Sequence, residues 1–449
     1  MVAEFYCEND EKEYYLKLRD DAFFHDGVKV TAKDVFFTYK NYEKLRPDLL
    51  GSYESIEVID NRSVVFKFKN NIKKDIFSFF TIGILPAHLL NESTVSGSDF
   101  FWDPVGSGPF MFNGVNERGE YFLKTNEDYY NGPAKVDQII FKPMYGLSKS
   151  SNALFREEID LLLFISSMQY KYAQEDQTFT VFRIPADYYY RISFDYNDKF
   201  FGNSDLRRAV SFAISRKKII NEVFCGLAQE CYGPFIFEQQ NSVIDEQYQP
   251  EKALELLHAH GFSRKEGDLY LSNQDGELLE LRFVTNPVIS FHLTILKNIV
   301  FQLAEIGIKV TYTPLDGYAD LIDKINDKDN KINAYLDPFG GGSEVDDILK
   351  YWKSDSSFED CLSLYKNEQV DLIINQIMNS SQEKRGSLYK KCYDLIMQDS
   401  PVVFLFYPYE LHAASSRLQN IESFFTSYRD SLSLKDVYIL KEGGEKYEY

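Results

Sequence analysis

The clearest structural signal in the chain is the segment Tyr15–Tyr39, which reads YLKLRDDAFFHDGVKVTAKDVFFTY. Aromatic and aliphatic residues in Glu13–Leu18 predict a β-strand, and His25–Gly27 predicts a turn. Thr31 offers a helix N-cap, and Asp34 stands at the third helical position, where the acid of a capping box belongs. The segment therefore predicts a strand, a turn and a helix in succession.

The same alternation of strand and helix patterns continues along the chain, which indicates an α/β protein. No repeat, heptad seam or low-complexity linker separates the elements, so we expect compact domain joints. Strands are predicted at 55–59, 63–68, 121–125, 136–142, 279–284, 309–314 and 402–407. Helices are predicted at 152–157, 205–224, 251–261, 293–306, 369–379 and 383–398.

Length and composition bound the class of protein. The chain has 449 residues, enough for two or three domains that each bury a core. It carries 49 Lys and Arg against 69 Asp and Glu, a net charge of −20, which disfavours nucleic acid and anionic membranes as partners. Gly and Pro interrupt the longest apolar stretch, residues 76–90, so we expect no transmembrane helix.

Motifs for catalysis and cofactor binding are missing from the sequence. There is no phosphate-binding GxxxxGK[ST], no HExxH and no GxSxG. Gly106-Ser107-Gly108 begins like a dinucleotide loop, but Pro109 removes a backbone donor, which favours a rigid turn. The histidines are scattered, and so we expect neither a cofactor nor a metal site.

One acidic cluster follows a glycine run at 340–342. It contains Glu344, Asp346 and Asp347. Three interpretations remain open: a pair of carboxylates as in a glycosidase, a solvated helix N-terminus, or a receptor loop whose acid meets a cationic group of a ligand.

Seven segments, in order, resemble family 5 of the bacterial extracellular solute-binding proteins, the dipeptide and oligopeptide receptors of ABC importers. Tyr15–Tyr39 resembles the family's strand, His-Asp-Gly turn and Thr-Ala-x-Asp-Val helix. Asp103–Phe110 (DPVGSGPF) is similar to its Pro-Val-Gly-Thr-Gly-Pro-Tyr segment, and Leu206–Ile220 to its Arg-x-Ala-x-x-x-Ala-Ile-Asp-Arg helix. The other segments are Asn126–Pro133, Tyr248–Phe262, Ile306–Val310 and Ser387–Tyr407.

The resemblance implies a type II periplasmic-binding-protein fold, with two α/β lobes joined by a strand hinge and one extra subdomain. It implies that residues 1–120 form the extra subdomain of lobe I, 121–194 the core of lobe I and 195–410 lobe II. Residues 411–449 would return to lobe I. In this fold the ligand is held between the lobes, and hinge closure buries it.

The resemblance also implies which residues bind the ligand. Pro338–Asp347 (PFGGGSEVDD) aligns with the family's Gly-Trp-Gly-x-x-x-Asp-Pro-Asp-like loop, whose first acid pairs with the ligand's ammonium group. Phe339 falls at the Trp position and Glu344 at the acid, with the longer Glu replacing Asp. The expected ligand-binding residues are Phe339, Gly340, Gly341, Glu344, Tyr407 and Tyr409.

The resemblance predicts a non-enzymatic, monomeric receptor outside the cytoplasm, in the periplasm or tethered to the outer face of the membrane. It would capture a peptide and deliver it to the permease of an ABC importer. Residues 1–10 carry no signal-peptide pattern, and we expect that the family's usual N-terminal segment is lacking. The alternatives are an oligosaccharide or nickel-chelate receptor of the same family, a secreted glycoside hydrolase, and a truncated fragment without function.

Overall fold

The structure is a computed structural model that describes most of the chain in two compact units. Unit 1 comprises Met1–Leu163, Ala173–Thr180 and Ala413–Tyr449, and unit 2 comprises Phe164–Tyr172 and Val181–His412. The described residues are 1–45, 53–69, 76–90, 99–235, 248–285, 290–314, 332–340, 345–356, 365–380, 382–426 and 434–440. Within these ranges no helix is both long and apolar enough to cross a membrane.

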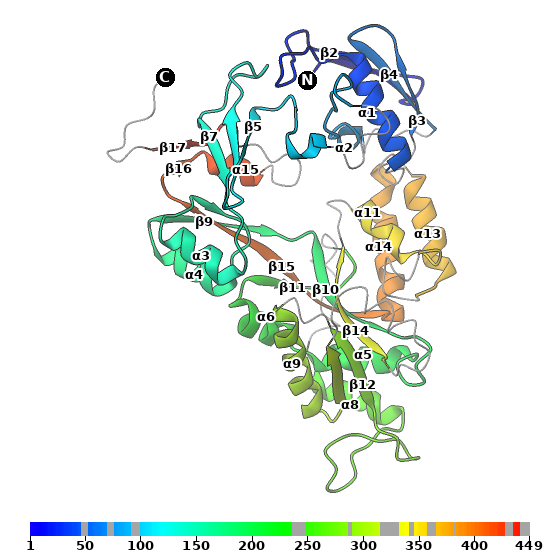
Figure 1. Cartoon of the computed structure of the whole chain (residues 1–449). Helices are drawn as coiled ribbons and strands as arrows, with labels where there is room; N and C mark the ends of the chain where they lie inside the picture. The colour runs from blue at the N-terminus through cyan, green and yellow to red at the C-terminus, as the bar shows by residue number, and fades with distance from the viewer. Residues whose placement is uncertain are drawn as a thin grey trace. The chain divides into compact units, whose positions relative to one another are not determined.

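Unit 1 begins with a four-stranded antiparallel sheet in the order β1-β2-β4-β3, covered by helix α1 (Figure 1). Its buried core joins the sheet to the helix through Tyr14, Leu16, Val35, Tyr39 and Phe66. The elements are β1 (Val2–Glu8), β2 (Glu13–Leu18), α1 (Ala32–Leu45), β3 (Tyr53–Val58), β4 (Ser63–Phe68) and α2 (Ile76–Phe79).

Half of the predicted capping box at the start of α1 is present: Asp34 accepts from the Thr31 backbone, but the Thr31 hydroxyl donates to Asp34 and does not accept from its N–H. The backbone N–H and the hydroxyl of Thr31 both donate to Asp34 Oδ2, at 2.8 and 2.7 Å. The other carboxylate oxygen, Oδ1, accepts from the N–H of Ala87 at 2.9 Å. Asp34 is 5% exposed, so one buried carboxylate ties the helix N-terminus to a segment 53 residues away.

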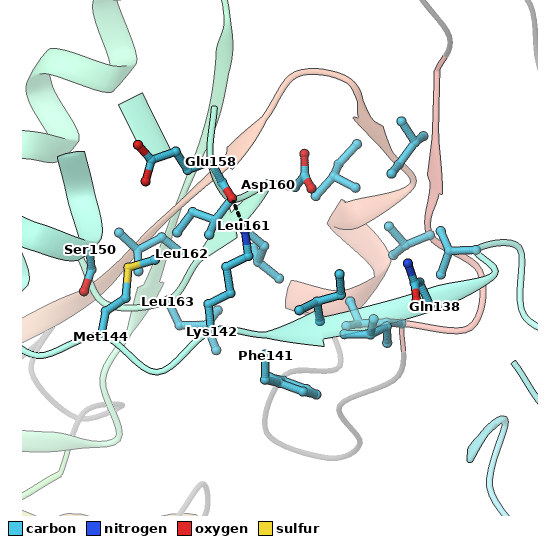
Figure 2. A pocket seen from close by; sticks show the side chains of 18 residues that line it. Gln138, Phe141, Lys142, Met144, Ser150, Glu158, Asp160, Leu161, Leu162 and Leu163 are labelled. Atoms are coloured by element: carbon cyan, nitrogen blue, oxygen red, sulfur yellow. Dashed lines mark hydrogen bonds between the residues drawn. The ribbon is translucent and has the colours of Figure 1, made fainter. Parts of the chain in front are cut away.

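The rest of unit 1 contains a three-stranded sheet, a pair of short strands and a cavity. The cavity, of about 620 Å³, lies beside strand β7 and residues 158–163, and Lys142 Nζ donates to the Glu158 carbonyl at its side (Figure 2). The elements are η2 (Asp99–Trp102), β5 (Phe110–Val115), β6 (Tyr121–Thr125), β7 (Gln138–Phe141), α3 (Leu147–Phe155), β8 (Leu161–Leu162), β16 (Leu418–Gln419), α15 (Ile421–Thr426) and β17 (Tyr438–Ile439).

Unit 2 is built on a mixed sheet in the order β11-β15-β10-β14-β12-β13. Strand β10 is central and pairs antiparallel with both β14 and β15, whereas β12 runs parallel to β13 and β14. Strands β8 and β9 also pair with β15, which passes from unit 2 into unit 1 after His412. The strands are β9 (Phe179–Pro185), β10 (Tyr188–Phe194), β11 (Ala228–Glu230), β12 (Glu280–Thr285), β13 (Lys309–Pro314), β14 (Ala334–Gly340) and β15 (Val402–Ser415).

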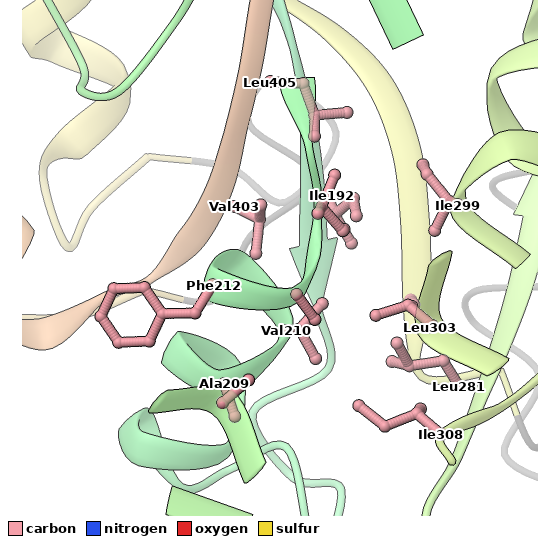
Figure 3. Close-up of a cluster of buried hydrophobic side chains, with 14 of the residues drawn as sticks. Ile192, Ala209, Val210, Phe212, Leu281, Ile299, Leu303, Ile308, Val403 and Leu405 are labelled. Atoms are coloured by element: carbon pink, nitrogen blue, oxygen red, sulfur yellow. The ribbon is translucent and has the colours of Figure 1, made fainter. Parts of the chain in front are cut away.

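Two helical groups cover the two faces of this sheet. One face packs on helices α5, α6, α8 and α9 through a core that includes Ile192, Val210 and Leu303 (Figure 3). The other face packs on α11, η5, α13 and α14 through Tyr189 and Phe404. These helices are α5 (Ser204–Ala213), α6 (Arg216–Phe224), α8 (Pro250–Ala259), α9 (Ser290–Glu305), α11 (Val345–Leu349), η5 (Lys350–Trp352), α13 (Glu368–Met378) and α14 (Gln382–Asp399). Helix α4 (Ser167–Glu175) contributes to neither core.

The predicted α/β class is confirmed, and several elements end where the sequence places them. Strands β2, β4 and β13 match the prediction residue for residue, and the pattern at 205–224 forms two helices that Ser215 separates as an N-cap. Strand β15 extends to Ser415, well beyond the predicted end at residue 407. The predicted domain boundaries at 120, 194 and 410 stay predictions.

Candidate functional site

The predicted ligand-binding residues that the structure describes lie on strands β14 and β15 of unit 2. Phe339 and Gly340 end β14, and Tyr407 and Tyr409 lie on β15. Gly341 and Glu344 fall outside the described residues, as do the side chains of Asp346 and Asp347. The described part of the site therefore consists of residues on these two strands, and the role of Glu344 stays a prediction.

Phe339 and Tyr407 meet in one buried aromatic cluster. The ring of Tyr189, on β10, lies 5.5 Å from that of Phe339 and 5.4 Å from that of Tyr407. Trp352 closes the cluster at 5.8 Å from Phe339. Phe339 and Tyr407 are each 4% exposed, so their rings form a packed aromatic floor at the end of β14.

A buried ion pair lies directly beside this aromatic floor. Arg191 Nε donates to Asp337 Oδ2 at 3.1 Å, and the Ser193 hydroxyl donates to Oδ1 at 3.1 Å. The Arg191 guanidinium also stacks on the Phe339 ring, 3.5 Å from its centroid. Burial raises the pKa of Asp337 to about 6, although the charge of Arg191 and the hydrogen bonds from Arg191 and Ser193 act to lower it. The carboxyl group is therefore still ionised at pH 7.

Gly340 fixes the direction in which the chain leaves β14. Its φ is +135°, a conformation that side-chain-bearing residues rarely adopt. A Cβ at this position would lie 2.6 Å from the Asp187 carbonyl oxygen and 2.8 Å from the Tyr188 Cα. The turn between β9 and β10 therefore packs against the backbone of Gly340, and only glycine allows that approach.

Tyr409 differs from Tyr407 in being only partly buried. The guanidinium of Arg183, on the neighbouring strand β9, lies 5.3 Å from the centroid of its ring. The next residue, Glu410, and Asp187 both contribute to raising the pKa of Tyr188, for which burial is the larger cause. This end of the sheet thus combines half-buried aromatic rings with charges of both signs.

No metal centre is found in the part of the chain that the structure describes. Among those residues no group of three or more His, Cys, Asp or Glu side chains is arranged to hold an ion. His412, the histidine of β15, is completely buried, and its Nδ1 accepts the backbone N–H of Phe164 at 3.4 Å. Burial lowers the pKa of His412 to about 4.

Sequence reasoning missed the residues that support the site: Tyr189, Arg191, Asp337 and Arg183. A signal for two of them is present, because Arg191 is the one charged residue in Tyr188–Phe194 (YYYRISF) and Asp337 the one in Ala334–Gly340 (AYLDPFG). Single opposite charges inside two apolar runs indicate paired neighbouring strands, since an unpaired buried charge is costly.

The fold described above agrees with comparison to known proteins. Residues 2–359 match the model of the bacterial extracellular solute-binding proteins, family 5 Middle, and the chain belongs to this family of binding proteins. Among individual relatives, the oligopeptide-binding protein AppA of Bacillus subtilis is 25% identical over 447 residues, covering 95% of this chain and 81% of that protein.

Two solved structures show the same fold. AppA from Bacillus subtilis in complex with a nonapeptide has a TM-score of 0.75 at 22% identity, covering 98% of this chain and 90% of that chain. NikZ from Campylobacter jejuni in complex with Ni(L-His) has a TM-score of 0.74 at 22% identity, covering 99% and 88%. The predicted type II periplasmic-binding-protein fold is thereby confirmed.

Proposed function

We propose that this chain is the peptide-binding receptor of an ABC importer. It captures a peptide without changing it chemically and delivers it to the membrane permease. The observation that carries the proposal is the similarity over nearly the whole chain to AppA of Bacillus subtilis, an oligopeptide-binding protein.

The geometry of unit 2 is compatible with an extended peptide ligand. Receptors of extended peptides rely on main-chain hydrogen bonds for affinity and on tolerant pockets for side chains. Gly340 turns the chain out of β14 next to the β9–β10 turn, and the packed rings of Tyr189, Phe339 and Tyr407 support that point rigidly. A rigidly held backbone at Gly340 favours main-chain hydrogen bonds to an extended peptide.

The proposal extends to partners and location. We propose a monomer that works outside the cytoplasm, in the periplasm or tethered to the outer face of the membrane, and binds no nucleic acid. The net charge of −20 supports the last point, because it opposes contact with a phosphate backbone. The ligand-binding residues proposed are Phe339, Gly340, Gly341, Glu344, Tyr407 and Tyr409, with the first acid of the loop on the ligand's ammonium group.

A thermal melt with and without peptides tests the proposal. A ligand that binds only the folded state at 100 times its Kd adds ~2.7 kcal/mol to the free energy of unfolding. We expect a mixed pool of di- to pentapeptides to raise the melting temperature by a few degrees. A pool of free amino acids at equal mass is the control, and a cooperative melt that the peptides leave unchanged would contradict the proposal.

A nickel-chelate receptor is the second candidate, because NikZ shares the fold. The buried His412 argues against a histidine ligand on β15. The same melt with nickel and L-histidine in place of peptide separates the two: a rise with the chelate alone would favour this second candidate.

A further inference from the structure

Another cavity of unit 1 is lined mostly by apolar side chains. It measures about 380 Å³ and lies beside strands β2 and β4 and helix α1, where Leu16, Val35 and Val64 line it. These three side chains belong to the core that joins the sheet to the helix. Water gains few hydrogen bonds in such a lining, because it finds few polar partners there. The cavity therefore favours an apolar occupant.

Two loop segments, 80–84 and 106–108, complete the lining, and hydrogen bonds fix both of them. The N–H of Leu85, directly after the first segment, donates to Thr38 Oγ1 at 2.9 Å. The His25 ring accepts from the N–H of the first glycine in the second segment and donates to the carbonyl of the last glycine, both at 3.1 Å. The cavity is therefore preformed, and a ligand need not order its walls on binding.

The lining also contains a hydroxyl group that can donate a hydrogen bond. The oxygen of Tyr130 accepts from the Tyr129 hydroxyl at 3.2 Å and from Met1 N at 2.9 Å. These two bonds use the lone pairs of the oxygen, and its proton remains to be donated, with no acceptor among the residues that the structure describes. The Arg19 guanidinium lies 5.2 Å from the ring centroid of Tyr130 and stabilises its position. A ligand that carries one oxygen acceptor would complete the hydrogen bonding of this phenol.

We propose that this cavity binds a medium-length aliphatic molecule whose chain packs on Leu16, Val35 and Val64 and whose single oxygen accepts the Tyr130 proton. A cavity of ~150 Å³ already holds benzene, so this one accommodates a chain of roughly eight carbons. A peptide is a poor occupant, because its amide groups would lose hydrogen bonds in an apolar lining. The site lies in unit 1, whereas the proposed peptide-binding residues lie in unit 2, and the inference goes beyond the proposed function without resting on it.

Methyl NMR spectroscopy of the whole protein tests the inference. The protein is titrated with 2-octanone, which has eight carbons and one carbonyl oxygen, and separately with 1-octene, which has eight carbons and no acceptor. We expect both molecules to shift the methyl signals of Leu16, Val35 and Val64 in a saturable way. Unchanged signals of these methyl groups at the highest concentration of both molecules would overturn the inference.

Tyr130→Phe tests the contact to the oxygen of the ligand. The variant keeps the ring beside Arg19 and loses only the hydroxyl. We expect the affinity for 2-octanone to fall by about threefold to tenfold, as for the loss of one hydrogen bond, and the affinity for 1-octene to stay the same. Equal effects on the two molecules would show that the hydroxyl does not contact the ligand and would overturn that part of the inference.

Ile82→Phe tests whether the ligand occupies this cavity. Ile82 is a partly buried lining residue, and the larger ring takes up space that the chain of the ligand needs. We expect binding of both molecules to be lost, while a cooperative thermal melt shows that the variant is folded. The matched control is Ile59→Phe, which adds the same bulk at an exposed position and should bind as the wild type does. Binding that persists in folded Ile82→Phe would place the ligand elsewhere and overturn the inference.

Discussion

At Gly340 a single hydrogen in place of a side chain lets the end of β14 lie close to the turn between β9 and β10. We expect Gly340→Ala to lower the free energy of unfolding by about 1–3 kcal/mol, because the new Cβ would lie 2.6 Å from the Asp187 carbonyl in a strained backbone conformation. Peptide affinity should fall as well, since the end of β14, with the proposed binding residues Phe339 and Gly340, must shift to relieve that contact. Urea unfolding and calorimetric titration measure the two effects.

Gly386 is the matched control for this substitution. It lies inside helix α14, and a Cβ there would meet no atom within 4 Å. Gly386→Ala should therefore raise the free energy of unfolding by about 0.5–1 kcal/mol, because glycine in a helix loses more conformational freedom on folding than alanine. If Gly340→Ala were as well tolerated as Gly386→Ala, the close approach at the end of β14 would be refuted.

Asp337 is the second residue whose replacement tests the structure, because it shows whether the buried ion pair with Arg191 stabilises the fold. We expect Asp337→Asn to destabilise the protein by about 3–5 kcal/mol at pH 7, because it leaves the buried Arg191 guanidinium without its counter-charge under Phe339. The exposed pair Lys390–Asp394 supplies the control, and Asp394→Asn should change stability little. Chemical denaturation of both variants is the measurement, and equal small effects would show that the buried pair contributes nothing.

Among the elements, helix α1 depends on one buried carboxylate at its start. Asp34→Ala removes the acceptor for the Thr31 N–H and hydroxyl and for the Ala87 N–H, three hydrogen bonds of a 5% exposed group. We expect a loss of about 1–3 kcal/mol, from the cap and from the unsatisfied donors. Lys33→Ala, exposed in the same helical turn, is the control. Hydrogen exchange of the α1 amides should rise in Asp34→Ala alone; unchanged protection would contradict the role of the cap.

The helices and strands also show which parts of the fold the sequence alone predicts. Capping residues placed the start of α1 correctly, and aromatic and aliphatic residues placed β2, because these signals depend on neighbours in the chain. Strands β10 and β14 were missed, since helices cover both faces of the sheet there and the period-two alternation of polar residues disappears. The floor of the candidate site lies on those two strands, so its residues depend on pairing between segments 146 positions apart, as in the contact of Arg191 with Asp337.

Across the whole molecule, three buried titratable groups of unit 2 make stability depend on pH. Burial lowers the pKa of His292 and of His412 to about 4 from an ordinary value of 6.5. Between these values the unfolded chain binds protons that the folded chain excludes, so stability is lost as the pH falls below 6.5. Asp337 acts in the opposite direction: its pKa is raised to about 6, so the folded state binds its proton more tightly and gains stability as the pH falls from 6 toward 4.

The histidines should prevail between pH 6.5 and 5. Each contributes a loss of about 2 kcal/mol over that interval at ~1.36 kcal/mol per pH unit, whereas Asp337 returns about 1.4 kcal/mol below pH 6. We therefore expect the free energy of unfolding to fall by about 2–3 kcal/mol, measured by urea titration at each pH.

His292→Gln keeps a partner for the Tyr190 hydroxyl but cannot titrate, and should weaken the pH dependence of the free energy of unfolding by about 2 kcal/mol. His258→Gln, exposed on α8, should leave the wild-type profile unchanged. A His292→Gln profile parallel to that of the wild type would show that this ring is protonated in the folded protein, and that its burial imposes no cost.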